Sequence, residues 1–280
     1  MFKTKPFVSE KVWGYERWIV STHEAGQSRA DEQTEFIGGK ELSRIAGKDY
    51  PLLVKIIQAD DTLSVQVHPD DEYALKNENT SGKTECWYVL DAVEGATLIC
   101  GLNADYTKEE LHKAIHDGTL EACLNYIPVQ KGDFMYIPAG TVHAIQGGLR
   151  LLEVQEPSDI TYRLYDWGRP REIHIEKGVE VTKNIQSRAE KPFSGLFSCQ
   201  YFTLEKQIIP GRGTIVFTLD EEKLTPAQET DWVCFFVLEG EGLCSSNTGE
   251  KFFVKKEDTV MVHLGEKISV EGNISIMKIY

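Results

Sequence analysis

Short β-rich runs separated by Gly, Pro, Asp or Asn recur along most of this sequence. Such punctuation is typical of an all-β sandwich or barrel, because each turn residue ends one strand and lets the chain reverse into the next. We therefore predict a mainly β fold with a few short helices. The predicted strands are Leu52–Gln58, Leu63–His68, Glu85–Leu90, Ala96–Cys100, Phe134–Ile137, Leu149–Gln155, Thr214–Leu219, Trp232–Leu238 and Ile274–Tyr280.

Helical signals are sparse. The clearest is the capping box formed by Thr107 and Glu110, which precedes an apolar helical stripe and predicts a helix that starts at Thr107. Two further short helices are predicted at Leu120–Leu124 and Asp70–Asn77.

A change in composition divides the chain. The sequence becomes polar between about Lys183 and Pro192, and a new set of β-runs follows. A length of 280 residues suits two β-domains of ordinary size. We predict two related β-modules, at residues 1–185 and 190–280, because the later segment faintly echoes a pattern of the earlier one.

The net charge of −14 gives the surface a mostly negative potential. This potential repels nucleic-acid phosphates and anionic lipid headgroups, so neither nucleic acid nor a membrane is an expected partner. The amino-terminal stretch has no apolar signal region, no run is long enough to span a bilayer, and the cysteines form no CxxC pair. We expect a cytoplasmic protein with reduced, mostly buried cysteines.

Two predicted strands each carry a polar face. Alternation places Ser64, Gln66 and His68 on one side of the first strand, and Lys83 and Glu85 together with Trp87 on one side of the second. On an isolated strand such a face is ordinarily a solvated surface. A metal or substrate site is the alternative, and it requires the two faces to converge.

A third segment ends in a Pro/Gly turn that presents His143. Two imidazoles, a carboxylate and a side-chain amide are suitable donors for a zinc-like divalent cation, whereas structural zinc more usually recruits thiolates. Each histidine taken alone is more often an ordinary core or surface residue. The same holds for His263, which we interpret as structural.

The motifs resemble a known family. Gly132, Pro138, Gly140 and His143 satisfy the second cupin motif, and the stretches Leu63–Asp71, Gly82–Tyr88, Tyr136–Ala144 and Thr161–Asp166 resemble the type I mannose-6-phosphate isomerases in their short bacterial form. The resemblance is strong over about residues 50–170. It implies two cupin-like β-sandwich (jelly-roll) modules, a metal-binding catalytic one at 1–185 and a degenerate one at 190–280.

The resemblance also implies roles for individual residues. The zinc ligands of the family fall on Gln66, His68, Glu85 and His143, with one Zn²⁺ per chain and Gln66 as the weakest ligand. Its catalytic arginine falls on Arg163 and a neighbouring active-site acid on Glu153. Residues of the substrate pocket fall on Ser64, Lys55, Lys83 and Trp13.

Two of these residues are unusual in their own right. Lys55 interrupts an apolar strand, where a buried charge is costly unless an anion neutralises it. A phosphate could be that anion, and the alternative is a lysine that snorkels from an edge strand. Glu153 lies among Leu151, Leu152 and Val154, so it is either paired with a base or held at the edge of a metal site.

The resemblance implies a zinc-dependent aldose–ketose isomerase that interconverts mannose 6-phosphate and fructose 6-phosphate through an enediol or enediolate. Arg163 would stabilise that intermediate, and either Glu153 or Lys83 would move the proton. Two alternatives remain open at this point: an iron-dependent cupin oxygenase and a non-catalytic sugar-phosphate sensor.

Overall fold

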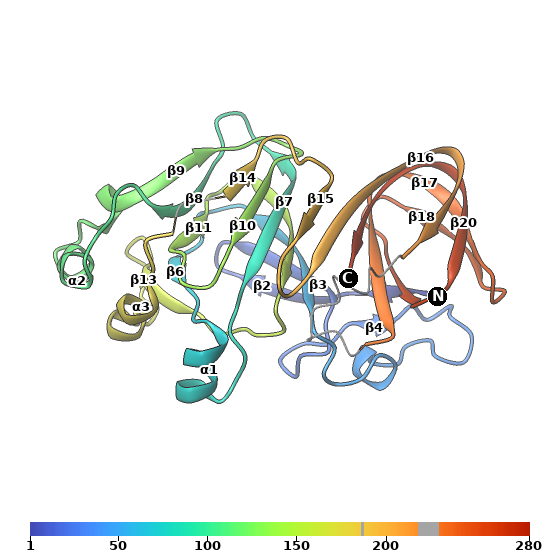
Figure 1. Cartoon of the computed structure of the whole chain (residues 1–280), viewed down its shortest axis with the longest axis horizontal. Coiled ribbons are helices and arrows are strands. Elements are labelled where there is room, and N and C mark those ends of the chain that lie inside the picture. The colour runs from blue at the N-terminus through green and yellow to red at the C-terminus, as the bar shows by residue number, and fades with distance from the viewer. Residues whose placement is uncertain (186–187, 218–229) are drawn as a thin grey trace. The chain divides into compact units, whose positions relative to one another are not determined.

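A computed structural model describes residues 1–185, 188–217 and 230–280. Strands dominate the order of its elements, which confirms the mainly β fold (Figure 1). The contacts divide the chain into two compact units. Unit 1 comprises Met1–Phe7, Trp18–Val54 and Ser194–Tyr280, and unit 2 comprises Val8–Arg17 and Lys55–Phe193. These units have other bounds than the predicted modules at residues 1–185 and 190–280. The assignment of a catalytic role to the first module and a degenerate one to the second stays a prediction.

Two sheets carry the residues predicted for the site. In the described part of the chain, one has the order β14-β10-β7-β12-β5-β3-β2 and the other β13-β6-β11-β8-β9. The bounds in the first are β14 Arg188–Glu190, β10 Phe134–Ile137, β7 Glu85–Ala92, β12 Leu149–Gln155, β5 Leu53–Ala59, β3 Gly14–Val20 and β2 Phe7–Lys11. The bounds in the second are β13 Tyr162–Tyr165, β6 Val65–Val67, β11 His143–Ile145, β8 Thr97–Leu102 and β9 Leu124–Pro128.

The two sheets face each other across an apolar core. One buried cluster combines Trp87 and Ile57 from the first sheet with Leu98 and Ile145 from the second. Alternation along each strand sends these side chains inward, and their burial supplies the main driving force for the packing. This sandwich is the cupin-like arrangement that the motifs predict.

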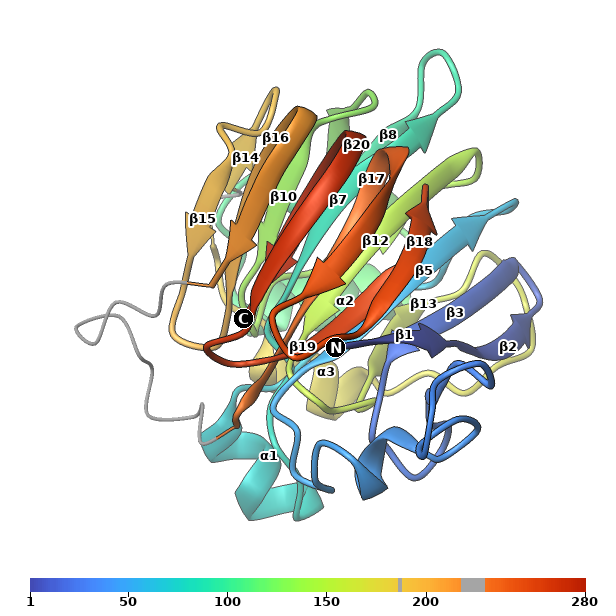
Figure 2. The same ribbon diagram turned by 90° about the vertical axis from the view of Figure 1, so that its right-hand side faces the viewer.

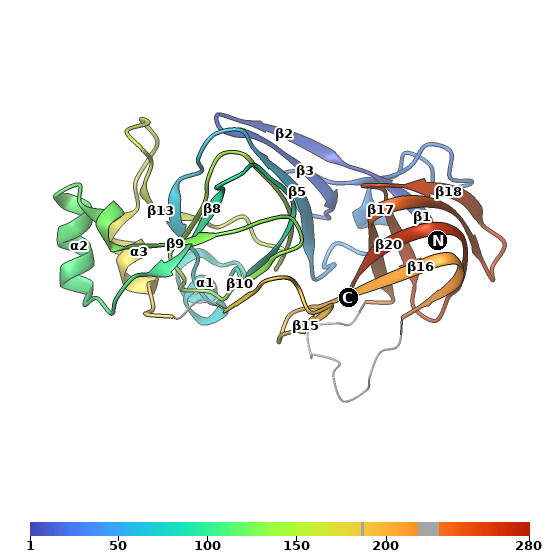
Figure 3. The same ribbon diagram turned by 90° about the horizontal axis from the view of Figure 1, so that it is seen from above.

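The helices pack outside the sandwich of unit 2. α2 (Lys108–His116) has the predicted capping box at Thr107, and α1 (Asp71–Glu78) begins at Asp70, whose side chain accepts a hydrogen bond from Tyr73 N. Leu120–Cys123 forms a short 3-10 helix, η2. A further helix that the sequence did not predict, α3 (Ile175–Val181), lies beside α2 (Figures 1 and 3). None of the described helices is long and apolar enough to cross a bilayer.

Unit 1 contains a sheet with the order β15-β16-β20-β17-β19-β1-β4, and β18 also pairs with β17 (Figure 2). Its long strands are β16 (Thr203–Val216), β17 (Trp232–Ser246) and β20 (Lys267–Ile279). The others are β1 Phe2–Lys5, β4 Arg29–Ala30, β15 Leu196–Ser198, β18 Lys251–Lys255 and β19 Thr259–His263, with a short 3-10 helix, η1, at Leu42–Arg44. The predicted strands Thr214–Leu219 and Ile274–Tyr280 overlap the ends of longer strands, and residues 218–219 lie outside the described residues.

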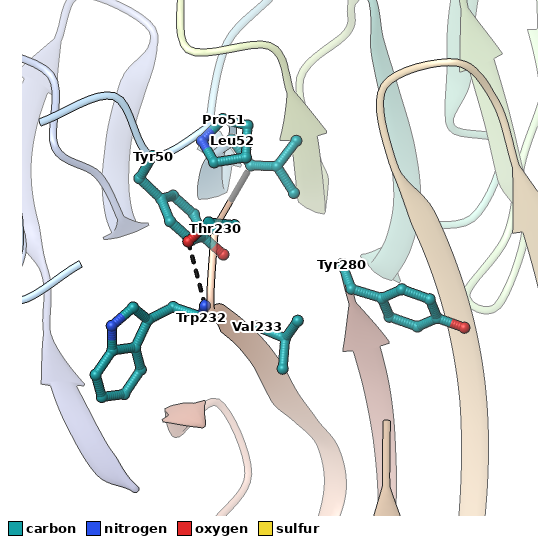
Figure 4. Close-up of a pocket in the computed structure, with 7 residues that line it drawn as sticks. All are labelled: Tyr50, Pro51, Leu52, Thr230, Trp232, Val233 and Tyr280. Carbon is teal, nitrogen blue, oxygen red and sulfur yellow. Dashed lines mark hydrogen bonds between the residues drawn. The ribbon is translucent and has the colours of Figure 1, made fainter. Parts of the chain in front are cut away.

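A small cavity lies in unit 1 between Tyr50, Trp232 and Tyr280 (Figure 4). Its volume is about 10 Å³, which is room for at most one water molecule. The backbone N–H of Trp232 donates to the Thr230 hydroxyl at 3.2 Å on its wall. This cavity is too small to hold a metabolite.

Candidate active site

Strand register places three of the predicted site residues in one row. His143 on β11 lies opposite Gln66 on β6, and Arg163 on β13 lies opposite Gln66 from the other side. Directly paired residues project to the same face of a sheet. The side chains of Gln66, His143 and Arg163 therefore share the face that looks toward the other sheet.

Glu85 reaches the same space from β7 of the opposite sheet. Its Oε2 lies 3.6 Å from Nε2 of His68, and its Oε1 lies 3.4 Å from Nε2 of His143. The two imidazole rings are 4.7 Å apart between centroids. His68, Glu85 and His143 thus form a compact cluster whose donor atoms lie within 4.8 Å of one another.

A tight turn sets the direction of the His143 ring. The Thr141 N–H and hydroxyl both donate to the Pro138 carbonyl, at 3.1 and 2.7 Å. The carbonyl of Thr141 then lies 2.8 Å from Nδ1 of His143. This contact favours the tautomer with the proton on Nδ1, and it leaves the lone pair of Nε2 directed at the cluster.

Burial suppresses charge on this cluster. The side chains of His68, Glu85 and His143 are each about 1% exposed. Burial, followed by the nearby Lys83, lowers the pKa of His68 well below its ordinary value, and burial lowers the pKa of His143 to about 4. Burial also raises the pKa of Glu85 to about 7, although Lys83 opposes that change. Both imidazoles are therefore neutral, as metal ligands must be.

The cluster fits a divalent cation. Within the described residues, Nε2 of His68 and Oε1 of Glu85 are buried without a hydrogen-bond partner. Buried polar atoms nearly always have a partner, and such orphaned atoms indicate a missing ion or water. Two imidazole nitrogens and one carboxylate form the donor set of an open metal site.

Gln66 lies at the edge of this cluster. Its Nε2 is 3.3 Å from Nε2 of His143, and its Oε1 accepts from the Ser64 hydroxyl at 3.4 Å. The amide nitrogen cannot coordinate a cation. A flip of the amide would exchange the two atoms and present Oε1 to the cluster.

Lys55 and Glu153 form a buried ion pair beside the cluster. Lys55 Nζ lies 2.9 Å from Glu153 Oε2, and the two side chains are only 6% and 4% exposed. Trp87 Nε1 donates to the other oxygen of Glu153 at 3.0 Å. Burial would raise the pKa of Glu153, but Lys55 and Lys83 outweigh burial and hold it below its ordinary value. Lys55 is therefore not a snorkelling lysine, and Glu153 is ionised.

The remaining predicted residues lie at different distances from the cluster. Lys83 is buried, with its Nζ 3.2 Å from Oε2 of Glu85. Ser64 contacts the cluster through Gln66. Trp13 is buried in the apolar core with Trp87. The next residue must be a glycine, because a Cβ on Gly14 would lie 2.0 Å from the Gln58 carbonyl oxygen.

Arg163 is partly exposed at the rim. Its NH1 donates to the Glu172 carbonyl at 2.8 Å, and its Nε is buried without a hydrogen-bond partner among the described residues. Burial, followed by the nearby Arg171, lowers its pKa, although the residue stays charged. No carboxylate faces it across the strand, since Gln66 is its partner.

Sequence reasoning missed a second group around Arg163. Asp166 is buried and binds both Arg169 and Arg171. The signal was present as three arginines within nine residues of a chain with net charge −14. The turn that brings them together was not readable from the residue types.

A β-sandwich that holds a buried His–Glu–His cluster between its two sheets is a metal-site protein of the cupin-like class. The type I phosphomannose isomerase catalytic domain model matches residues 1–95. Mannose-6-phosphate isomerase ManA of Bacillus subtilis is 35% identical over 93% of this chain and 92% of its own length. The chain belongs to the type I mannose-6-phosphate isomerase family, and it is an enzyme of that family.

Further relatives agree with this assignment. The mannose-6-phosphate isomerase of Streptococcus mutans is 44% identical over 59% of this chain and 57% of its own length. The crystal structure of the mannose 6-phosphate isomerase from Bacillus subtilis superposes with a TM-score of 0.83 at 29% identity, over 100% of this chain and 99% of the other. A structure of a mannosephosphate isomerase homologue from Archaeoglobus fulgidus, 20% identical with a TM-score of 0.76, shares the fold.

Proposed function

We propose that this enzyme interconverts mannose 6-phosphate and fructose 6-phosphate, that it depends on zinc, and that the reaction passes through an enediolate. The observation that carries the proposal is the buried cluster of His68, Glu85 and His143, which lies between the sheets beside an ionised Glu153. The relatives at 35% and 44% identity are named mannose-6-phosphate isomerases, which supports the choice of substrate.

The donor set supports zinc. Two neutral imidazoles and one carboxylate suit a borderline cation, and Gln66 would complete the set after its amide flips. Such an ion, when bound, would act as a Lewis acid for the negative charge that develops on the sugar oxygens. Gln66 is the weakest of the proposed ligands because its neutral amide oxygen is the poorest donor.

The chain's own residues would move the proton. The reaction removes a proton from C2 of the aldose and returns a proton to C1, while the oxygens on C1 and C2 exchange their carbonyl and hydroxyl character. Glu153 is ionised at rest, so it is ready to accept the C2 proton, and we propose it as the base. Lys83, beside Glu85, would donate to the developing oxyanion.

Arg163 would complete the charge compensation from the rim. Its guanidinium shares the face of Gln66 and His143, and its Nε has no hydrogen-bond partner among the described residues. We propose that it stabilises the enediolate. Ser64, Lys55, Lys83 and Trp13 are the proposed substrate-pocket residues, although Lys55 contributes through Glu153, which already neutralises it.

Two alternatives are less well supported. An iron-dependent oxygenase would use the same His–Glu–His set as a facial triad, but the relatives are isomerases and a buried lysine pairs with Glu85. A non-catalytic sensor would not need an ionised carboxylate held at the edge of the cluster.

A coupled isomerase assay tests the proposal. The purified protein would be stripped with a chelator and assayed on mannose 6-phosphate, glucose 6-phosphate and mannose, with and without added zinc. We expect turnover of mannose 6-phosphate that is lost on stripping and restored by zinc. Full-rate turnover by exhaustively stripped protein would show that the metal role is wrong, and oxygen uptake with stoichiometric iron would favour the oxygenase.

A further inference from the structure

Asp166 is a buried carboxylate held by two arginines. Arg171 donates to it in a bidentate arrangement, from Nε to Oδ2 at 2.6 Å and from NH2 to Oδ1 at 2.5 Å. Arg169 donates from Nε to Oδ1 at 3.1 Å. The Asp166 side chain is 1% exposed. The Arg171 side chain is partly exposed, at 29%. A bidentate arginine–carboxylate pair is geometrically specific, and its charge-assisted hydrogen bonds are stronger than neutral ones.

The chain must bend sharply to bring these groups together. Trp167 has a φ of +54° and Gly168 a φ of +80°. A bulky aromatic residue rarely adopts a positive φ, and the surrounding contacts must stabilise that conformation. The Asp166–arginine contacts span this bend from both sides, so they are part of what holds it.

Two further hydrogen bonds fix the bend to the segment that precedes β6, the strand of Gln66. Trp167 Nε1 donates to the Leu63 carbonyl at 2.6 Å, and Arg169 NH2 donates to the Thr62 carbonyl at 2.6 Å. Both acceptors directly precede Ser64 in the chain. The bend is therefore anchored to the segment that leads into β6.

Beyond the bend, the same loop holds Arg163. The Glu172 carbonyl accepts from Arg163 NH1 at 2.8 Å. His174 binds the backbone of Arg163 on both sides, since its N–H donates to the Arg163 carbonyl at 2.7 Å and its Nδ1 accepts from the Arg163 N–H at 3.2 Å. Among the described residues, the Glu172 carbonyl is the one hydrogen-bond partner of the Arg163 guanidinium. The place of Glu172 follows from the course of the loop after Arg171.

We infer that Asp166 is a positioning residue for Arg163. Its bidentate bond to Arg171 sets the path of the loop, so that the Glu172 carbonyl meets the Arg163 guanidinium and directs it toward the face of Gln66. This inference rests on the proposed function, in particular on the role given to Arg163. Asp166 itself does not touch the cluster.

The first test compares Asp166→Asn with wild type in the intact enzyme. An amide keeps the volume but has no charge and only one acceptor oxygen, so it cannot accept from both Nε and NH2 of Arg171 in the bidentate arrangement. The loop therefore loses its bidentate anchor. We expect kcat to fall by about tenfold to a hundredfold, while KM changes little and bound metal stays at the wild-type level. Glu41→Gln is the matched control, because it removes an exposed arginine–carboxylate pair with Arg29. It should leave both constants unchanged.

A double-mutant cycle decides whether Asp166 acts through Arg163. If it does, Asp166→Asn has almost no further effect on kcat in an Arg163→Ala background. If the loss of kcat in the double variant equals the product of the two single-variant losses, the inference is wrong. A wild-type kcat in Asp166→Asn would also overturn it. Full activity of Arg163→Ala would instead overturn the proposed role of Arg163, and the inference with it.

Arg171→Lys provides the second variant if Asp166→Asn does not fold. It keeps a charge beside Asp166 but loses the bidentate geometry. We expect a smaller loss of kcat that also disappears in the Arg163→Ala background. A loss that persists there would overturn the inference.

Discussion

At the scale of single residues, substitutions in the buried Lys55–Glu153 pair should strongly lower the stability of the fold. Lys55→Met would leave a carboxylate buried without its partner, which costs about 3–5 kcal/mol. We expect the free energy of unfolding to fall by about this amount, as measured by urea denaturation of the metal-free protein. Lys55→Met combined with Glu153→Gln should recover much of the loss. A single variant as stable as wild type would show that water already reaches the pair.

Glu156 leads to a second prediction, which concerns how the free energy of unfolding depends on pH. Its carboxyl is buried, accepts from Thr84 N at 2.6 Å and faces Asp71 on α1. Burial, followed by the charge of Asp71, raises its pKa from 4.5 to about 8. The folded protein therefore keeps this proton after the unfolded chain has lost it. The stabilisation is complete below pH 4.5 and is lost as the pH rises to about 8.

Glu156→Gln tests this, since an amide stays neutral at every pH. Because burial also changes the pKa of Glu85 and of both histidines, the informative quantity is the difference in unfolding free energy between wild type and variant. We expect the unfolding free energy of wild type minus that of the variant to fall as the pH rises from 4.5 to about 8. The slope should be at most about 1.4 kcal/mol per pH unit. Parallel curves for the two proteins would contradict a protonated Glu156.

The residues of the site were only partly predictable. Strand alternation alone placed Gln66 with His68 and Lys83 with Glu85, but a solvated face would give the same pattern. Their approach to each other depends on the pairing of distant strands, and the family resemblance supplied that expectation. The cluster of Asp166 with Arg169 and Arg171 was not predicted, because its bend requires a positive φ at Trp167. Bulky aromatic residues rarely adopt that conformation, so the sequence does not indicate a bend there.

At the scale of elements, a helix or strand could be predicted when the residues that define its ends lie close together in the sequence. α2 was predicted because its capping box is complete within the sequence. α3 has no capping side chain, and the carbonyl of Arg163 instead fixes its first residues through His174. The prediction separates β-runs at glycine residues, so it covers only the carboxy-terminal ends of the long strands β16 and β20, which contain Gly211 and Gly272. In the structure these glycines pair with each other inside the ladder.

The turn before His143 gives the prediction at this scale. Gly140 has a φ of +92°, and a Cβ there would lie 2.8 Å from the Lys183 side chain and 3.0 Å from the Val181 carbonyl. Gly140→Ala should shift the turn and with it His143, so we expect weaker zinc binding together with lower stability. Gly95→Ala is the matched control, because Gly95 has a φ of +79° and no atom near its Cβ position. Titration calorimetry with zinc should show reduced affinity only for Gly140→Ala.

At the scale of the whole molecule, the proposed metal site links three chain segments that are far apart in sequence. His68 directly follows β6, Glu85 is the first residue of β7, and His143 is the first residue of β11. Such a site exists only in the folded protein, so bound zinc favours the folded state by mass action. Zinc at a hundredfold excess over its Kd would add about 2.7 kcal/mol.

This linkage predicts how heating the stripped protein responds to zinc. Adding the ion should raise the melting temperature of unit 2, because His68, Glu85 and His143 all belong to it. If the two units melt separately, the transition of unit 1 should not move. His143→Ala should abolish the response, whereas His263→Ala, which alters an exposed histidine of unit 1, should keep it. An equal zinc response in both variants would place the ion elsewhere in the chain.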